Sequence, residues 1–464
     1  MIDAPRFLEN LYLKQRHKMT INITRDIDRE LVKWKESHSR RPLLVRGARQ
    51  VGKTYSIIEF AKASFENHVA VNFEERPEFS MCFQSLDVKE IIEKISVLSG
   101  SEITAGKTLL FLDEIQECPQ AIVALRYFYE KVPELHVIAA GSLVEFAFKS
   151  NEFRMPVGRI TFLFMGPLSF DEFLGALGFV KLRQYLAGVN ISSGMDPLYE
   201  KELEKLLRKY LIIGGMPGVV SEYLKDISPE EINIVQTSII KTYEADFSKY
   251  SSTAKHKYLK DVFISAPRMV GERYKYSHVN PHVQSRDLKD ALRLLEEAQC
   301  LKKVIHSSGQ GVPLGAQTNE KKFKILFFDV GLMQRSLGLS AELMFEDNLL
   351  TANLGSVIEQ YVGQEILAAA DWYEERNIYF WARDAKSSNA EVDYLVTSGS
   401  TVYPVEVKSG KTGTLKSMHL FLKEHPSSPL GIRFSMQKLS FYDGILSIPL
   451  YMVKHWERIV KSVV

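Results

Sequence analysis

A phosphate-binding loop pattern, G-x-x-x-x-G-K-[ST], occupies residues 47–54 of the 464-residue chain. An apolar run at residues 42–46 and a helical pattern at residues 55–65 flank it, as a strand and a helix flank such loops. The glycines let the backbone turn its N–H groups toward phosphates, while Lys53 neutralises phosphate charge and Thr54 offers a hydroxyl to Mg²⁺. The residues predicted to contact ATP are Gly47, Ala48, Arg49, Gln50, Val51, Gly52, Lys53, Thr54 and Tyr55.

A second apolar run, at residues 108–114, ends in two carboxylates. Asp113 is predicted to hold Mg²⁺, and Glu114 is predicted to orient and polarise the water that attacks the nucleotide. The alternative is that the acidic pair merely opens a surface turn. A third apolar run ends at Ser142, whose hydroxyl is predicted to sense the γ-phosphate unless it is an ordinary loop serine.

Two arginines, Arg154 and Arg159, follow in the segment FRMPVGRI. Either could reach the phosphates of a neighbouring subunit as an arginine finger, which offsets charge in the transition state. Both are equally compatible with ordinary surface positions, and the segment itself does not decide between the two interpretations.

Short apolar runs alternate with amphipathic stretches over residues 21–217, which predicts an α/β domain with a parallel sheet and helices on both faces. Residues 218–345 are mostly helical and end in a strand, a loop and a further strand, a succession typical of a winged helix. Residues 346–464 show a helix, three strands and another helix, which predicts a second, smaller α/β domain. Residues 1–20 are interpreted as an extension.

The composition is that of an ordinary soluble protein, with 45% hydrophobic and 25% charged residues. No run of about eighteen apolar residues occurs, so a membrane span is not expected. The first residues lack the apolar core of a secretory signal. Cys82, Cys118 and Cys300 are far apart in sequence, so neither a disulfide framework nor a zinc site is indicated. We therefore expect a protein of the reducing cytoplasm.

The net charge of +2 is unevenly distributed, since residues 241–345 carry 17 basic and 11 acidic side chains. Tyrosines there alternate with lysines and arginines, a mixture that suits contacts with phosphates and stacking on sugars or bases. Lys321, Lys322 and Lys324 are predicted to lie on the hairpin that would form the wing. The alternatives are a solvated basic face and tyrosines that pack into a helical core, and the latter is favoured for most of the tyrosines.

Two carboxylates and an ammonium are predicted to meet near the end of the chain, where Asp393 lies on one strand and Glu406 and Lys408 lie on the next. Residues two apart share a face of a strand, so Glu406 and Lys408 point the same way, and Glu391 shares the face of Asp393. Glu359, on the preceding helix, would be a third acid. Asp393 and Glu406 suit Mg²⁺ or Mn²⁺, with Lys408 activating water. The alternatives are a fold that only binds DNA or partners and a strand whose charges face water.

Ten segments between about residue 21 and residue 435 form a recognisable set: LLVRGARQVGKT, VNFEE, LLFLDEIQECPQAIVALRYFYE, VIAAGSLVEFAF, MPVGRI, PLSFDEFL, YLIIGGMP, LFFDVGLM, IEQYVGQEI and VEVKSG. Together they resemble the prokaryotic AAA-like ATPases that carry a restriction-endonuclease-like C-terminal region. The resemblance implies an AAA-type core, a winged-helix middle and a PD-(D/E)XK nuclease fold at the end. Because AAA-like cores usually need an arginine from a neighbour, it also implies nucleotide-promoted homo-oligomers, with a monomer or a dimer as the alternatives.

The leading hypothesis is an ATP-driven, Mg²⁺-dependent protein of DNA processing or DNA surveillance, in which the ATP state controls a nuclease module through the winged helix. Two predicted phosphate-handling sites on either side of a basic middle segment motivate it. A rival hypothesis is an ATP-dependent switch or assembly protein whose nuclease-like domain only recognises a partner. A third is a scaffold that does not hydrolyse ATP. DNA is favoured over RNA as the nucleic acid.

Overall fold

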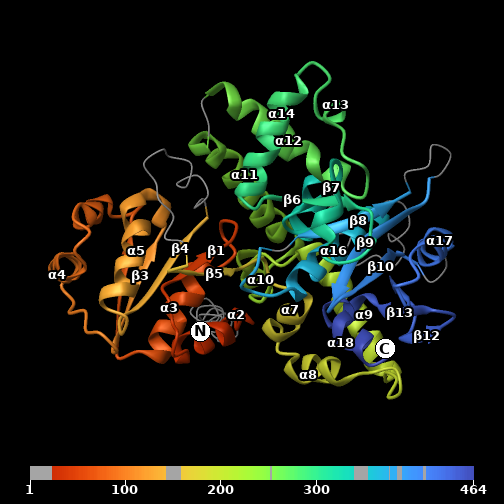
Figure 1. Cartoon of the computed structure of the whole chain (residues 1–464), viewed down its shortest axis with the longest axis horizontal. Coiled ribbons are helices and arrows are strands. Elements are labelled where there is room, and N and C mark those ends of the chain that lie inside the picture. Colours follow the sequence, from red (N-terminus) through yellow and green to blue (C-terminus); the bar gives the residue numbers. More distant parts are fainter. Residues whose placement is uncertain are drawn as a thin grey trace, which may run out of the picture.

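The first part of the chain folds around a parallel sheet of five strands (Figure 1). The computed structural model describes residues 23–142, 158–250, 253–338, 354–375, 377–383, 389–410 and 414–464. The strands stand in the order β2-β3-β4-β1-β5, and every neighbouring pair runs parallel, which confirms the predicted α/β sheet. Their bounds are β1 Leu43–Arg46, β2 Asn67–Asn72, β3 Thr108–Asp113, β4 His136–Gly141 and β5 Thr161–Phe164.

Alternate residues of these strands belong to different cores, which is why both faces of the sheet carry helices. On β3, Leu109 and Phe111 share one core with helices α2 and α3, whereas Leu110 and Leu112 share another with α4 and α5. The strands therefore read as continuous apolar runs, as parallel strands buried on both faces do. The helices are α2 Ile27–Glu36, α3 Lys53–Ser64, α4 Val88–Ser99 and α5 Pro119–Lys131.

A group of helices connects this sheet to the rest of the chain (Figure 1). Helix α14 is amphipathic, because Leu288, Ala291, Leu292 and Leu295 are buried at intervals of three and four residues. It packs on α12, which also contacts α11 and β7. The helices are α7 Phe170–Ala176, α8 Val180–Gly188, α9 Pro197–Ile213, α10 Pro217–Tyr223, α11 Pro229–Tyr250, α12 Thr253–Met269, α13 Tyr276–Val279, α14 Ser285–Glu297 and α15 Val330–Ser336.

The last part of the chain forms a mixed sheet of eight strands in the order β12-β13-β11-β10-β9-β8-β6-β7. Helix α16 packs on one face of this sheet and α17 packs on the other. The bounds are β6 Leu301–Ser307, β7 Thr318–Phe327, β8 Ile378–Ala382, β9 Glu391–Ser398, β10 Thr401–Val407, β11 Gly431–Ser435, β12 Ser440–Tyr442, β13 Ile445–Pro449, α16 Leu354–Ala369, α17 Lys416–Glu424 and α18 Trp456–Lys461.

The hairpin predicted as a wing is present as β6 and β7, but it belongs to this eight-stranded sheet. Strand β6 pairs with β7 on one side and runs parallel to β8 on the other, so the hairpin forms the edge of the C-terminal sheet. The winged-helix interpretation of the middle segment stays a prediction.

Two expectations from composition can be compared with the fold. Among the residues that the structure describes, no helix combines the length and the apolarity needed to cross a membrane. The three cysteines are buried and form no disulfide.

Candidate functional site

Three segments meet at the carboxyl ends of β1, β3 and β4, which are neighbours in the first sheet. The loop of residues 47–52 follows β1, Asp113 ends β3, and Ser142 follows β4. In open parallel sheets, ligands bind outside the carboxyl ends of the strands. The fold therefore gathers the loop, the acidic pair and Ser142 where a ligand is expected.

Two glycines of the loop are required for different reasons. A Cβ on Gly47 would lie 2.2 Å from the carbonyl oxygen of Met165, so no side chain fits there. Gly52 has a φ of 95°, in the left-handed region that favours glycine, and it immediately precedes α3. This conformation turns the chain into the helix, so the N-terminus of α3 opens toward the loop.

Lys53 is held inside the curled loop. Its ammonium donates to the carbonyl oxygens of Gly47 and Ala48, both at 2.9 Å, and the residue is buried. Burial lowers the pKa of Lys53 to about 8, although the carboxylates of Glu114 and Asp113 act to raise it. A phosphate is a stronger partner for an ammonium than a carbonyl oxygen is, so this lysine is placed to receive one.

Thr54 and Asp113 supply oxygen ligands beside Lys53. The Thr54 hydroxyl donates to Asp113 Oδ2 at 2.8 Å, and the side-chain amide of Asn72 lies 3.5 Å from the same oxygen. Burial raises the pKa of Asp113, while the hydrogen bond from Thr54 acts to lower it. Hydroxyl and carboxylate oxygens are ligands that Mg²⁺ prefers, so these residues fit a magnesium ion that accompanies a nucleotide.

Glu114 and Ser142 border the same edge of the sheet. Glu114 has a φ of 48°, and its Oε2 accepts a hydrogen bond from the side chain of Gln116 at 2.6 Å. Ser142 is buried, and its hydroxyl has no hydrogen-bond partner within the described part of the chain. A buried hydroxyl without a partner costs free energy, as expected of a group that contacts a ligand.

Three other residues, Tyr55, Arg154 and Arg159, were predicted to contact nucleotide. Tyr55, on the first turn of α3, is exposed. The guanidinium of Arg159 pairs with Glu130 on α5 at 2.9 Å, and the arginine is 44% exposed. An exposed arginine is available to a neighbouring chain, so the finger role stays a prediction. Arg154 lies outside the described residues.

Arg25, which the sequence patterns did not indicate, holds the phosphate-binding loop. Its guanidinium donates to the carbonyl oxygens of Val51 at 2.9 Å and Gly166 at 2.8 Å. Its Nε also pairs with Glu172 at 2.9 Å, and both side chains are only 3% exposed. The loop backbone is thus tied to a buried ion pair.

The C-terminal segment contacts the residues around this ion pair. Lys454 lies 2.6 Å from the carboxylate of Asp26 and donates to the hydroxyl of Ser169 at 2.9 Å. The next residue, His455, lies 3.1 Å from the carboxylate of Asp171. The end of the chain therefore packs directly on the elements that position the loop.

Helix α11 also contacts the loop. The hydroxyl of Tyr243 donates to the carbonyl oxygen of Arg49 at 2.5 Å, and the Arg49 guanidinium pairs with Asp246 at 2.9 Å. A change in the loop backbone would therefore be transmitted to α11 through both contacts.

Replacing Arg25 by alanine is expected to lower the free energy of unfolding by about 3 to 5 kcal/mol, because it leaves Glu172 buried without its partner. Urea unfolding followed by circular dichroism measures the loss. Arg29→Ala, an exposed position on the helix α2 that follows Arg25, is the matched control. A loss no larger than that of the control would contradict the structural role of Arg25.

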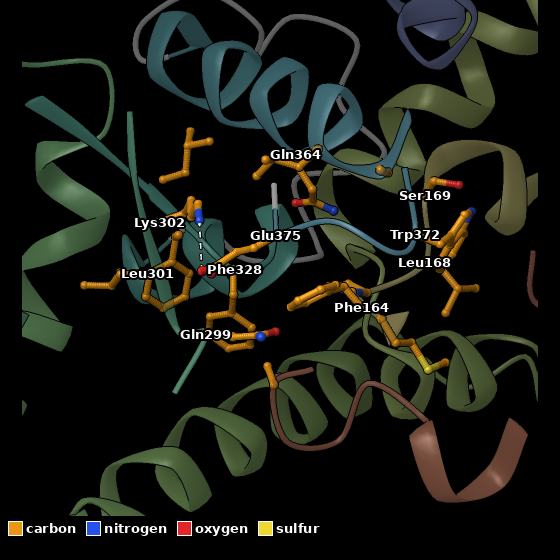
Figure 2. A pocket seen from close by; sticks show the side chains of 18 of the residues that line it. Phe164, Leu168, Ser169, Gln299, Leu301, Lys302, Phe328, Gln364, Trp372 and Glu375 are labelled. Carbon is orange, nitrogen blue, oxygen red and sulfur yellow. Dashed lines mark ion pairs between the residues drawn. The ribbon is translucent and has the colours of Figure 1, made fainter. Parts of the chain in front are cut away.

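A cavity of about 160 Å³ lies where the two sheets and the loop approach one another. Ala48 of the loop lines it, and Figure 2 shows Phe164, Phe328 and Trp372, which come from three separate parts of the chain, around it. Lys302 and Glu375 pair at 3.7 Å in its wall. Because its walls come from separate elements, any relative shift of these elements changes its shape.

The predicted C-terminal residues lie close to one another. Asp393 accepts a hydrogen bond from the backbone N–H of Val407 at 2.7 Å, and the Lys408 ammonium donates to Glu406 at 2.5 Å. Burial raises the pKa of Glu406 to about 7, and the nearby carboxylate of Asp393 adds to this rise. Glu359, from α16, completes the predicted set.

Lys324, on β7 of the predicted hairpin, is buried in this cluster. Its side chain is 2% exposed, and its ammonium lies 3.0 Å from Glu359, 2.7 Å from Glu391 and 3.7 Å from Asp393. It cannot contact a nucleic acid from this position. Lys321, three residues earlier, is exposed.

The basic middle segment contains both buried aromatic residues and exposed cations. Tyr274 is buried and stacks on Phe323, with ring centroids 5.2 Å apart, so it belongs to the core. Arg286, Lys289 and Arg293 are exposed at intervals of three and four residues along α14 and therefore share one face of that helix.

Comparison with family models identifies three regions of the chain. Residues 39–174 match the family described as "AAA domain". Residues 204–343 and residues 354–453 match families described as "Domain of unknown function (DUF8612)" and "Domain of unknown function (DUF4143)". The first match and the five-stranded parallel sheet agree, so the N-terminal region is an AAA-like ATPase domain.

Similarity to solved structures is distant. The Walker-type ATPase PABY2304 of Pyrococcus abyssi is 14% identical with a TM-score of 0.40, covering 68% of this chain and 96% of that chain. The ORC2 protein of Aeropyrum pernix in its ADPNP-ADP complexes is 11% identical, with a TM-score of 0.38 and coverage of 69% and 95%. The ORC1 protein of Aeropyrum pernix in complex with DNA is 14% identical, with a TM-score of 0.32 and coverage of 70% and 95%. Scores this low do not indicate what the present chain does. The comparison with curated proteins gives no match.

Proposed function

We propose that the chain binds and hydrolyses Mg-ATP at its AAA-like domain and uses the nucleotide state as a switch that acts on DNA. The observation that carries the proposal is the convergence of Lys53, Thr54 and Asp113 at one edge of the parallel sheet. A buried ammonium, a hydroxyl and a carboxylate at a helix N-terminus form an arrangement suited to a triphosphate.

Each of these residues has a separate role in the proposal. The backbone N–H groups of the loop and the ammonium of Lys53 bind the phosphates, and Lys53 exchanges its carbonyl partners for phosphate oxygens. Thr54 and Asp113 would hold Mg²⁺, which offsets phosphate charge when bound. Glu114 orients the attacking water and accepts its proton. Ser142 donates its hydroxyl to the terminal phosphate.

The contacts of the loop give the nucleotide state a route to the rest of the chain. Arg25 connects the carbonyl of Val51 to Glu172, and Arg49 connects the loop to α11. Nucleotide binding that shifts the loop backbone therefore alters both connections. We further propose that nucleotide promotes a homo-oligomer in which an arginine such as Arg159 reaches the neighbouring site.

DNA binding is proposed for the exposed basic face of α14. Replacing Arg286, Lys289 and Arg293 together by glutamate is expected to weaken binding to a duplex oligonucleotide, because attraction to the phosphates becomes repulsion. The slope of log affinity against log salt should fall by about 1 for each phosphate that the variant no longer neutralises. Fluorescence anisotropy over a salt series measures both quantities.

The control for this experiment is Lys89→Glu, an exposed change on α4 at the N-terminal sheet. If the triple variant and the control bind DNA as the unaltered protein does, the proposed face of α14 is ruled out. ATP hydrolysis measured with and without the same oligonucleotide then shows whether DNA changes the rate.

A second candidate function is a metal-dependent nuclease in the C-terminal domain. It is favoured by the proximity of Asp393, Glu406 and Lys408, which sequence analysis predicted. Lys324 stands against it, since a cation already sits among the carboxylates. Measurements of Mn²⁺ binding at this cluster separate the nuclease from a recognition module.

A further inference from the structure

The carboxylate cluster under α16 contains its own cation. Lys324 reaches it from the edge strand β7, which β6 and β8 separate from β9, the strand of Glu391 and Asp393. Its ammonium is within 3.7 Å of three carboxylates, those of Glu359, Glu391 and Asp393, and lies 5.4 Å from the ring centre of Phe380. An ammonium among three carboxylates occupies the kind of position that a divalent ion would take.

The lysine is charged in this position. Burial acts to lower the pKa of Lys324, but the carboxylates of Glu359, Asp393 and Glu391 together raise it above its ordinary value. Burial raises the pKa of Glu359, whereas the ammonium of Lys324 acts to lower it. The lysine is therefore an ammonium that pairs with the carboxylates around it.

Other cations complete the neutralisation. Arg273 pairs with Glu391 at 3.1 Å, and Lys408 pairs with Glu406 at 2.5 Å. Thus four carboxylates face three basic side chains, and little negative charge remains to attract a divalent ion. Within the described residues, no group of three or more His, Cys, Asp or Glu side chains has the geometry to hold a metal ion.

We propose that Lys324 is the resident cation of this cluster and that the C-terminal domain keeps the cluster as a metal-free lock between β7, β9 and α16. As arranged, the residues do not fit Mg²⁺ or Mn²⁺, because the ammonium fills the space between their oxygens. The lock fastens the hairpin of β6 and β7 to the sheet and to α16.

Mn²⁺ binding to the full chain without nucleotide tests the proposal. Electron paramagnetic resonance measures unbound Mn²⁺, and the comparison of interest is between the unaltered protein and Asp393→Asn or Glu406→Gln. The two carboxylate variants should bind as much Mn²⁺ as the unaltered protein, because the cluster takes none. Stoichiometric binding that both variants abolish would overturn the proposal.

The lysine itself is tested with Lys324→Met, which keeps the length of the side chain and removes its charge. This variant should either gain a Mn²⁺ site that depends on Asp393 or melt about 5 to 10 °C lower, because buried carboxylates lose their counter-ion. Lys321→Met, an exposed change on the same strand, is the matched control. If Lys324→Met matches this control in both melting temperature and Mn²⁺ binding, the lock does not exist.

Discussion

Replacement of Lys53 by methionine is expected to abolish detectable ATP binding and to reduce ATP hydrolysis by at least about 100-fold. The physical reason is that the buried ammonium is the cation held inside the loop, where it donates to Gly47 and Ala48 until a phosphate replaces those partners. Methionine fills the same space without offsetting any phosphate charge. Calorimetric titration with Mg-ATP measures binding, and phosphate release measures turnover.

The control for this substitution is Lys62→Met, on the exposed side of the same helix, where the lysine pairs with Glu59. That variant should bind and hydrolyse ATP like the unaltered protein. If Lys53→Met retained full affinity and turnover, the proposed ATP site would be wrong. Circular dichroism of both variants separates loss of binding from loss of folding.

Replacement of Glu114 by glutamine is expected to leave ATP binding intact while lowering the hydrolysis rate by about 10²- to 10⁴-fold. Glutamine keeps the size of the side chain, and its amide oxygen can still accept the hydrogen bond from Gln116. It cannot accept a proton from the attacking water. Single-turnover hydrolysis with prebound ATP measures the chemical step directly.

Glu117→Gln, an exposed change in the turn that follows, is the control for this second variant. An unchanged rate in Glu114→Gln would support the alternative that the acidic pair only opens a turn. A parallel loss of binding and hydrolysis would assign Glu114 to the architecture of the site instead of to the chemistry.

The parts of the site that could be predicted from the sequence are those whose signals are local. The phosphate-binding loop is a contiguous pattern between a strand and a helix, and Asp113 ends a strand whose apolar run is easy to read. Because ligands bind outside the carboxyl ends of parallel strands, the loop and Asp113 are expected at the same edge of the sheet. The roles of these residues remain predictions until variants are measured.

Arg25 and Lys324 could not be predicted, because their partners are distant in sequence. Arg25 pairs with Glu172, which is 147 positions away, and nothing in the surrounding sequence marks it. Lys324 lies on one of two strands joined by a loop. Such strands have the same sequence pattern whether they form an exposed wing or the edge of a larger sheet. Long-range pairing with β8, which no local pattern encodes, decides between the two.

The placement of β6 and β7 limits how the chain can be divided. A fragment that begins at residue 346 would lack both strands, so the backbone N–H and C=O groups of β8 that pair with β6 would become an unpaired edge. The same fragment would leave the carboxylates around Glu359 without the ammonium of Lys324. The C-terminal region is therefore not a detachable module, and gene truncations that follow the linear order of the chain would sever a single folding unit.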